Sequence, residues 1–170
     1  MGSVPIFLSL FFVAAAALAQ AEERVLELAA GETLRYSVLD APAPSALSAR
    51  DTAMRLLRHL ADGEIEQAAL LSNAPRRRYE VLHEYRASVG EEEFKRLFAQ
   101  YFLPENRLVA EVALDARRLL VWDLGGAEHR LAGQYYVEVE GRFLMDDVPS
   151  EKRAQLRRVL EAYRTGKARF

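Results

Sequence analysis

The sequence predicts an α+β fold in which N-terminal helices pack on a curved antiparallel sheet, with a further helix at the C-terminus. Three observations lead to this fold class. Apolar side chains recur at helical spacing over residues 48–102, they alternate with polar ones after Pro104, and helical spacing returns over residues 150–165. Helices followed by strands that succeed one another through short turns are typical of α+β domains. With 170 residues, of which 51% are hydrophobic, the chain has the profile of one globular domain.

The first 19 residues predict a cleaved signal peptide. No charged side chain occurs from Met1 to Ala21, and Val4 to Ala19 is almost continuously apolar. Ala17-Leu18-Ala19 has the small-x-small form that a signal peptidase accepts, and Ala19-Gln20-Ala21 is a second candidate. An uncleaved anchor is the alternative, but the run is shorter than the roughly 20 residues of a spanning helix. We therefore expect an extracytoplasmic protein, periplasmic or secreted, with no stable membrane span after cleavage.

Residues 20–47 predict a β-hairpin extension and a proline-rich linker. Arg24–Leu28 forms one arm, Gly31-Glu32 lies at the turn, and the other arm alternates from Leu34 to Val38. The segment from Asp40 to Ser45 contains two prolines, which interrupt regular structure. The linker is expected to separate the hairpin from an α+β domain over residues 48–170.

The helical half is predicted from caps and apolar stripes. Ser48 can cap a helix that ends at Gly63, and a second short helix follows it. Asn73 is placed to cap a third helix, which has Pro75 in its first turn and ends at Gly90. The expected buried stripe of this third helix is Val81, Leu82, Tyr85 and Val89. The fourth helix has the clearest helical spacing, with Phe94, Leu97, Phe98, Tyr101 and Phe102.

Four strands and a last helix follow. The strands are expected over residues 108–114, 118–124, 129–140 and 142–145, and the second of them is apolar on both faces. Ser150 is placed to cap the C-terminal helix over residues 150–165.

Composition and missing motifs exclude several classes of chemistry. The chain has no cysteine, so disulfides, thiolate nucleophiles and cysteine zinc sites are excluded. Its net charge of -2 argues against nucleic acid as a partner. The three histidines lack metal-ligand spacing, and no phosphate-binding glycine loop or nucleophile elbow is present, so no metal and no cofactor is expected. The basic run Arg76–Arg78 could meet phosphate or anionic lipid, but pairing with Glu80 on a solvated face is the expected role.

Two stretches resemble a known superfamily. Leu56–Ser72, with Asp62-Gly63-Glu64 followed by Ala68-Ala69-Leu70-Leu71-Ser72, resembles the first helices of the nuclear transport factor 2-like (NTF2-like) superfamily, which includes SnoaL-like and ketosteroid-isomerase-like proteins. Gly141-Arg142-Phe143 followed by Asp146-Asp147-Val148 resembles the last strand of many small bacterial members.

This resemblance extends over about residues 50–148. It implies a cone of helices and curved sheet around an apolar pocket, often dimeric through the sheet. Functions in the superfamily range from isomerase to ligand-binding or accessory module, and the fold does not select among them. The hairpin before residue 41 and the helix Ser150–Arg164 lie outside the minimal pattern, so either could plug the pocket or bind a partner.

Five residues are candidates for function. An isomerase or dehydratase would need a base, for which Asp123 or His83 is available, and a hydroxyl donor, for which Tyr135 or Tyr79 is available. Burial beside apolar neighbours would prepare Asp123 to accept a proton, whereas a place at the strand end would leave it solvated. Tyr135, Tyr79 and Trp122 are the candidates for ligand contact, with core packing as the competing role of Tyr135 and Trp122.

The sequence leaves three functions open. The first is an exported, non-enzymatic domain that binds a small apolar ligand or a protein partner. The second is an isomerase-type or dehydratase-type enzyme, for which Asp123 and Tyr135 should face one cavity within about 6 to 8 Å. The third is a homodimeric assembly subunit whose seam uses Trp122 and Tyr136.

Overall fold

The computed structural model of the chain describes residues 21–40, 47–126 and 130–169. The predicted signal peptide, most of the proline-rich linker and His129 lie outside the described residues.

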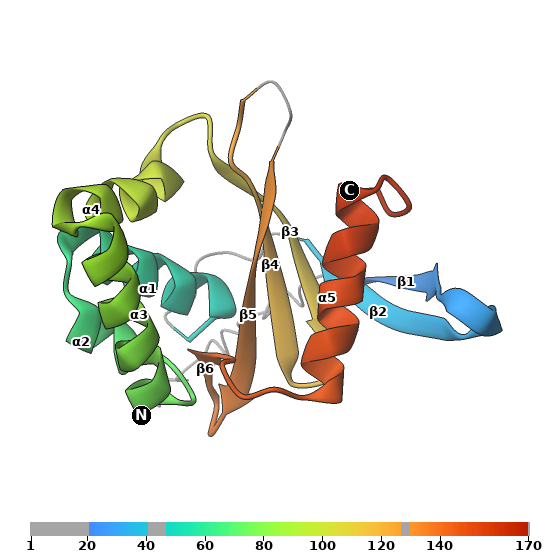
Figure 1. Cartoon of the computed structure of the whole chain (residues 1–170). Coiled ribbons are helices and arrows are strands. Elements are labelled where there is room, and N and C mark those ends of the chain that lie inside the picture. Colours follow the sequence, from blue (N-terminus) through green and yellow to red (C-terminus); the bar gives the residue numbers. More distant parts are fainter. Residues whose placement is uncertain (1–20, 41–46, 127–129, 170) are drawn as a thin grey trace, which may run out of the picture.

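The described residues form a curved, six-stranded antiparallel sheet (Figure 1). Its strands are β1 (Ala21–Glu27), β2 (Thr33–Leu39), β3 (Arg107–Leu114), β4 (Arg117–Asp123), β5 (Leu131–Val139) and β6 (Arg142–Met145), and they pair in the order of the chain. A short 3-10 turn, η1 (Ala29–Gly31), joins β1 to β2. Because Ser37 to Leu39 of β2 pair with β3, the first two strands continue the sheet that the last four strands form.

The helices begin and end near the predicted positions. They are α1 (Ala49–Asp62), α2 (Ile65–Ala69), α3 (Pro75–Val89), α4 (Glu91–Ala99), the 3-10 turn η2 (Gln100–Phe102) and α5 (Glu151–Arg164). The predicted caps of α1 and α5 are confirmed, because the Oγ atoms of Ser48 and Ser150 accept hydrogen bonds from the backbone N–H groups of Asp51 (3.0 Å) and Arg153 (3.1 Å).

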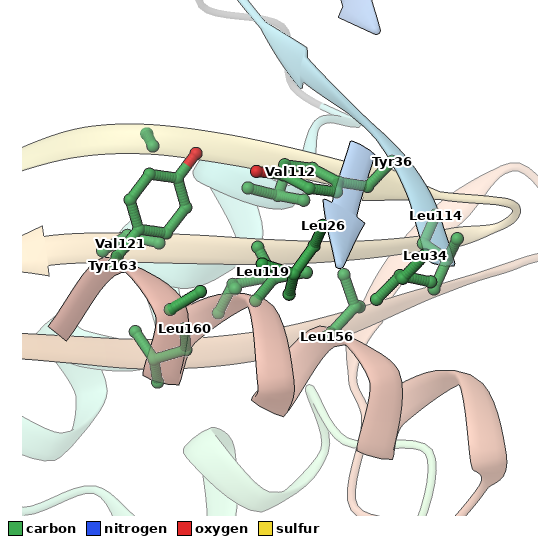
Figure 2. Close-up of a cluster of buried hydrophobic side chains, with 13 residues drawn as sticks. Leu26, Leu34, Tyr36, Val112, Leu114, Leu119, Val121, Leu156, Leu160 and Tyr163 are labelled. Carbon is green, nitrogen blue, oxygen red and sulfur yellow. The ribbon is translucent and has the colours of Figure 1, made fainter. Parts of the chain in front are cut away.

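Helices cover both faces of the sheet, with α1–α4 on one face and α5 on the other (Figure 1). In the first core, Phe94 and the leucines of α1 pack on Leu120 and Trp122 of β4. In the second core, α5 packs on the opposite face of β4 and on the β1–β2 hairpin. Figure 2 shows the main side chains of this second core: Leu26, Leu34, Tyr36, Val112, Leu114, Leu119, Val121, Leu156, Leu160 and Tyr163. The prediction that the strand β4 is apolar on both faces is confirmed, because one core packs on each of its faces.

The third helix differs from its prediction in two ways. Of the expected buried stripe only Leu82 is buried, and Val81 and Tyr85 are exposed. Asn73 does not cap α3, whose first residue follows Ala74 with no side-chain cap. The side chain of Asn73 instead bonds to the segment after β6, so tertiary contacts hold this end of the helix.

Candidate ligand-binding cavity

A buried polar junction fixes the end of β6 to the helical half. The Asp146 side chain is 1% exposed, and its two oxygens accept hydrogen bonds from Arg117 Nε (2.9 Å) and Asn73 Nδ2 (2.9 Å). The Oδ1 atom of Asn73 accepts the backbone N–H of Asp147 (2.8 Å). Asp146 is thus paired with a cation and hydrogen-bonded, as a buried carboxylate requires.

The neighbouring carboxylate of Asp147 is held in the same manner. Its Oδ2 atom accepts from Arg78 Nε (2.7 Å) and from Ser72 Oγ (2.6 Å), and Arg78 donates a second bond to its Oδ1 atom. This bidentate pair is the strong form of an arginine–carboxylate contact. Each of the two aspartates therefore has one arginine partner.

Strand β5 has a free edge beside this junction. The short strand β6 pairs only with Tyr136–Val139, so the first five residues of β5 have no strand on that side among the residues that the structure describes. In an antiparallel ladder, every second residue directs its backbone N–H and C=O to the same side. The carbonyl of Tyr135 accepts the Asp146 N–H (2.8 Å), and that of Leu131 accepts Arg164 Nη2 (2.9 Å). Gly133 lies midway between them and therefore directs its N–H and C=O to the free edge.

A cavity of about 260 Å³ lies at this edge. Its apolar walls come from α1, α3, α4 and β6, and they are formed by Leu56, Leu60, Leu82, Phe98 and Met145. Its other walls come from Gly133 and from the polar side chains of Arg78, Gln134, Tyr135, Asp146 and Arg153. Of the eleven lining residues, five are apolar and five have polar side chains, and apolar walls with polar groups that can orient a ligand are typical of small-molecule sites.

Arg153 is the one polar residue of the cavity whose charge is not matched within the described residues. Its guanidinium forms no ion pair there, and its buried Nε atom has no hydrogen-bond partner. Its central carbon lies 5.4 Å from the centre of the Tyr135 ring, a cation–π contact. Arg153 also lines two smaller adjoining cavities, of about 200 Å³ beside Arg77 and about 140 Å³ beside Arg157.

Tyr135, a sequence candidate for ligand contact, lies beside the cavity and near Arg153 of α5. It lines the cavity and its phenol is partly buried. Burial raises the pKa of Tyr135, while the nearby guanidinium groups of Arg164, Arg153 and Arg157 act to lower it. This hydroxyl is therefore neutral at physiological pH and sits among cations.

Asp123 does not join Tyr135 in one site. It is 8% exposed, which overturns the expectation of a solvated side chain, and its Oδ1 atom accepts the N–H of Gly125 (3.0 Å). It pairs across the sheet with Leu131, whose Cα atom lies about 13 Å along β5 from that of Tyr135 at the usual rise of a strand. Asp123 does not line the cavity that Tyr135 lines, so the expected catalytic pair in one cavity is not found among the described lining residues.

The other candidates lie away from the cavity. His83 and Tyr79 are on the exposed side of α3, with their ring centres 5.8 Å apart. Trp122 is 4% exposed, and its Nε1 atom donates to Gln134 Oε1 (2.9 Å) while its ring meets that of Tyr101 edge-on. Trp122 and the fully buried Tyr136 lie in the core beneath α1–α4, so a homodimer seam made from this pair is wrong.

The sequence reasoning missed Arg153, Gly133 and Gln134. Arg153 looked like one of several arginines on an amphipathic helix, and Gln134 carried no pattern of its own. Gly133 did carry a signal, because an isolated glycine within a strand often marks a close approach of other groups.

The described residues contain neither a metal-binding cluster nor a helix that could span a membrane. In the described part of the chain, no group of three or more histidine, cysteine, aspartate or glutamate side chains is placed to hold a metal ion. No helix of that part is both long enough and apolar enough to cross a lipid bilayer. No protein-family model, curated protein or solved structure matches the chain.

Proposed function

We propose that this chain is an exported NTF2-like domain that binds a small, largely apolar molecule in the cavity between α1, α3, α4 and β5. The cavity itself carries the proposal, because its apolar residues offer contact area to a small molecule and its polar side chains can orient it. At roughly 30 Å³ for each small group, about 260 Å³ accommodates roughly eight or nine non-hydrogen atoms. The packing of α1–α4 on one face of the sheet supports the NTF2-like assignment, and residues 1–19 support export.

Binding is favoured over acid–base catalysis by the state of the carboxylate in the cavity. Asp146 is the only aspartate or glutamate among the described lining residues, and both of its oxygens accept hydrogen bonds from Arg117 and Asn73. A general base must be free to accept a proton from the substrate. Asp146 instead maintains the shape of the cavity.

The proposal is tested by native mass spectrometry and by titration of the purified protein with 1-octanol. An extra mass that disappears on denaturation is expected, or saturable octanol binding if the protein is purified empty. The same spectrum reports whether residues 1–19 have been removed. The variant Leu82→Phe narrows the cavity and should weaken octanol binding at least about fivefold, as the added ring atoms take its volume.

The matched control is Leu97→Phe, the same change at a partly exposed position on α4 that does not line the cavity. It should leave octanol binding within about twofold. The proposal fails if neither a bound mass nor octanol binding is found. It also fails if Leu82→Phe and Leu97→Phe lower the affinity for octanol equally.

A further inference from the structure

The unmatched charge of Arg153 indicates what kind of molecule occupies the cavity. A half-buried guanidinium is normally paired, since its desolvation otherwise costs free energy. Here the two carboxylates nearby are already paired, Asp146 with Arg117 and Asp147 with Arg78. The positive charge of Arg153 is thus left over, and its stacking on Tyr135 satisfies none of its N–H groups.

The charges around Arg153 reinforce this excess. Arg77 lines the adjoining cavity on the α3 side, and it donates a long hydrogen bond of 3.5 Å to the backbone carbonyl of Asp147 but forms no ion pair among the described residues. Arg157 lines the adjoining cavity on the α5 side. Three arginines from two helices therefore line this cavity or the two that adjoin it, and none of them has an ion pair in the described part of the chain.

The free edge of β5 supplies a second, independent donor. The N–H of Gly133 points to that edge, where none of the described strands faces it, and Gly133 lines the cavity together with Arg153. A backbone N–H beside a guanidinium is a common arrangement for holding an oxyanion. The opposite wall of the cavity is apolar, with Leu56, Leu60 and Phe98.

We propose that the ligand of this cavity is a short-chain amphiphile whose oxyanion, a carboxylate or a phosphate or sulfate ester, binds Arg153 and the Gly133 N–H while its alkyl chain lies against the leucines. This inference rests on the proposed function and adds the charge of the ligand. Arg77 and Arg157 supply further positive potential to the headgroup, and Arg78 stays with Asp147.

The test is calorimetric titration of the purified protein with three probes: octanoate, 1-octanol and inorganic phosphate. Octanoate and octanol share their chain, so the headgroup accounts for the difference between them. Octanoate should bind at least about tenfold more tightly than octanol. Raising the ionic strength should lower the affinity for octanoate and leave the affinity for octanol unchanged, because salt screens only the charged headgroup.

Two variants assign the effect to Arg153. Arg153→Gln should lower the affinity for octanoate at least about tenfold and leave the affinity for octanol within about twofold of the unchanged protein. The control Arg158→Gln makes the same change in the same helix at an exposed position that lines a different cavity, beside the β1–β2 hairpin, and should leave both probes within about twofold. If Arg153→Gln does not fold, the comparison of octanoate with octanol and the salt series, both on the unchanged protein, still show whether a charged headgroup contributes to binding.

The outcomes separate the two proposals. If octanol binds and octanoate binds no more tightly, the anionic headgroup is refuted and the apolar ligand stands. If neither binds, both proposals fail. Phosphate alone is expected to bind more weakly than octanoate, and phosphate that binds as tightly would make this a site for a free anion and overturn the amphiphile. Octyl phosphate then distinguishes an ester headgroup from a carboxylate, and tight binding of either supports the inference.

Discussion

The close approach of α5 to β5 at Gly133 leads to a quantitative prediction about stability. A Cβ atom added at Gly133 would lie 2.4 Å from Leu160 Cδ2 and 3.0 Å from Leu119 Cδ1. The first distance is well inside van der Waals contact, so the helix or the leucine must shift. Overpacking of this kind lowers the free energy of unfolding by about 1–3 kcal/mol. The smaller conformational entropy of alanine in the unfolded chain offsets about 0.4–1 kcal/mol of this loss. We expect Gly133→Ala to lower the free energy of unfolding by about 1–2 kcal/mol.

A double-mutant cycle shows whether this contact is the cause. Leu160→Ala alone should cost about 2–5 kcal/mol, because it leaves a cavity under α5. In the double variant the new methyl group no longer meets the leucine and fills part of that cavity. The double variant should therefore be about 1–3 kcal/mol more stable than the sum of the single effects. Urea unfolding followed by circular dichroism measures all four proteins.

The control pairs Gly133→Ala with Leu57→Ala, a buried leucine on the opposite face of the sheet. These two changes should be additive within about 0.5 kcal/mol. A coupling between Gly133 and Leu160 that is no larger than this control value would refute the reasoning about close approach.

Three further predictions follow from single residues. Asp146→Ala should destabilise the protein by about 3–5 kcal/mol in urea unfolding, because it leaves Arg117 without its buried partner, and a cost below about 1 kcal/mol would contradict this account. Ser150→Ala should cost about 1 kcal/mol through loss of the α5 cap, whereas Ser150→Gly should cost only a few tenths, and equal costs would show that the cap is unimportant. Burial raises the pKa of Tyr163 from 10.0 to about 12, so the folded state holds this proton more tightly than the unfolded state. The free energy of unfolding should therefore fall as the pH rises from about 10 to about 12, and Tyr163→Phe should remove part of that fall, as urea unfolding at a series of pH values will test.

Local signals predicted the elements of the fold well. Ser48 and Ser150 predicted two helix starts, since a cap depends only on neighbours in the chain. Residues 118–124 predicted a strand that is apolar on both faces, and the two cores that pack on β4 account for this pattern. The third helix was less predictable, because Val81 and Tyr85 follow a helical apolar spacing whether or not another element covers them.

The candidate site was predicted only in part, because it depends on register and on chain ends. Tyr135 was found from strand alternation, but its distance from Asp123 is set by the pairing of β4 with β5. The cavity exists because β6 stops after four residues and leaves Gly133 at an edge. Arg153 comes from α5 and lines the same cavity as Gly133. No local pattern in the sequence of α5 predicts that these two residues lie in one cavity.

The order of strands in the sheet has a consequence for how the protein folds. Four of the five strand pairs join neighbours in the chain, whereas β2 and β3 are separated by residues 40–106, which contain α1–α4. Closing this one long loop costs more chain entropy than forming any of the hairpins. We expect the β3–β6 meander to form early and the β1–β2 hairpin to dock late, with amide hydrogens in β1 exchanging faster than those in β4. The helical half is in effect an insertion between two adjacent strands, and docking of the hairpin then completes the surface on which α5 packs.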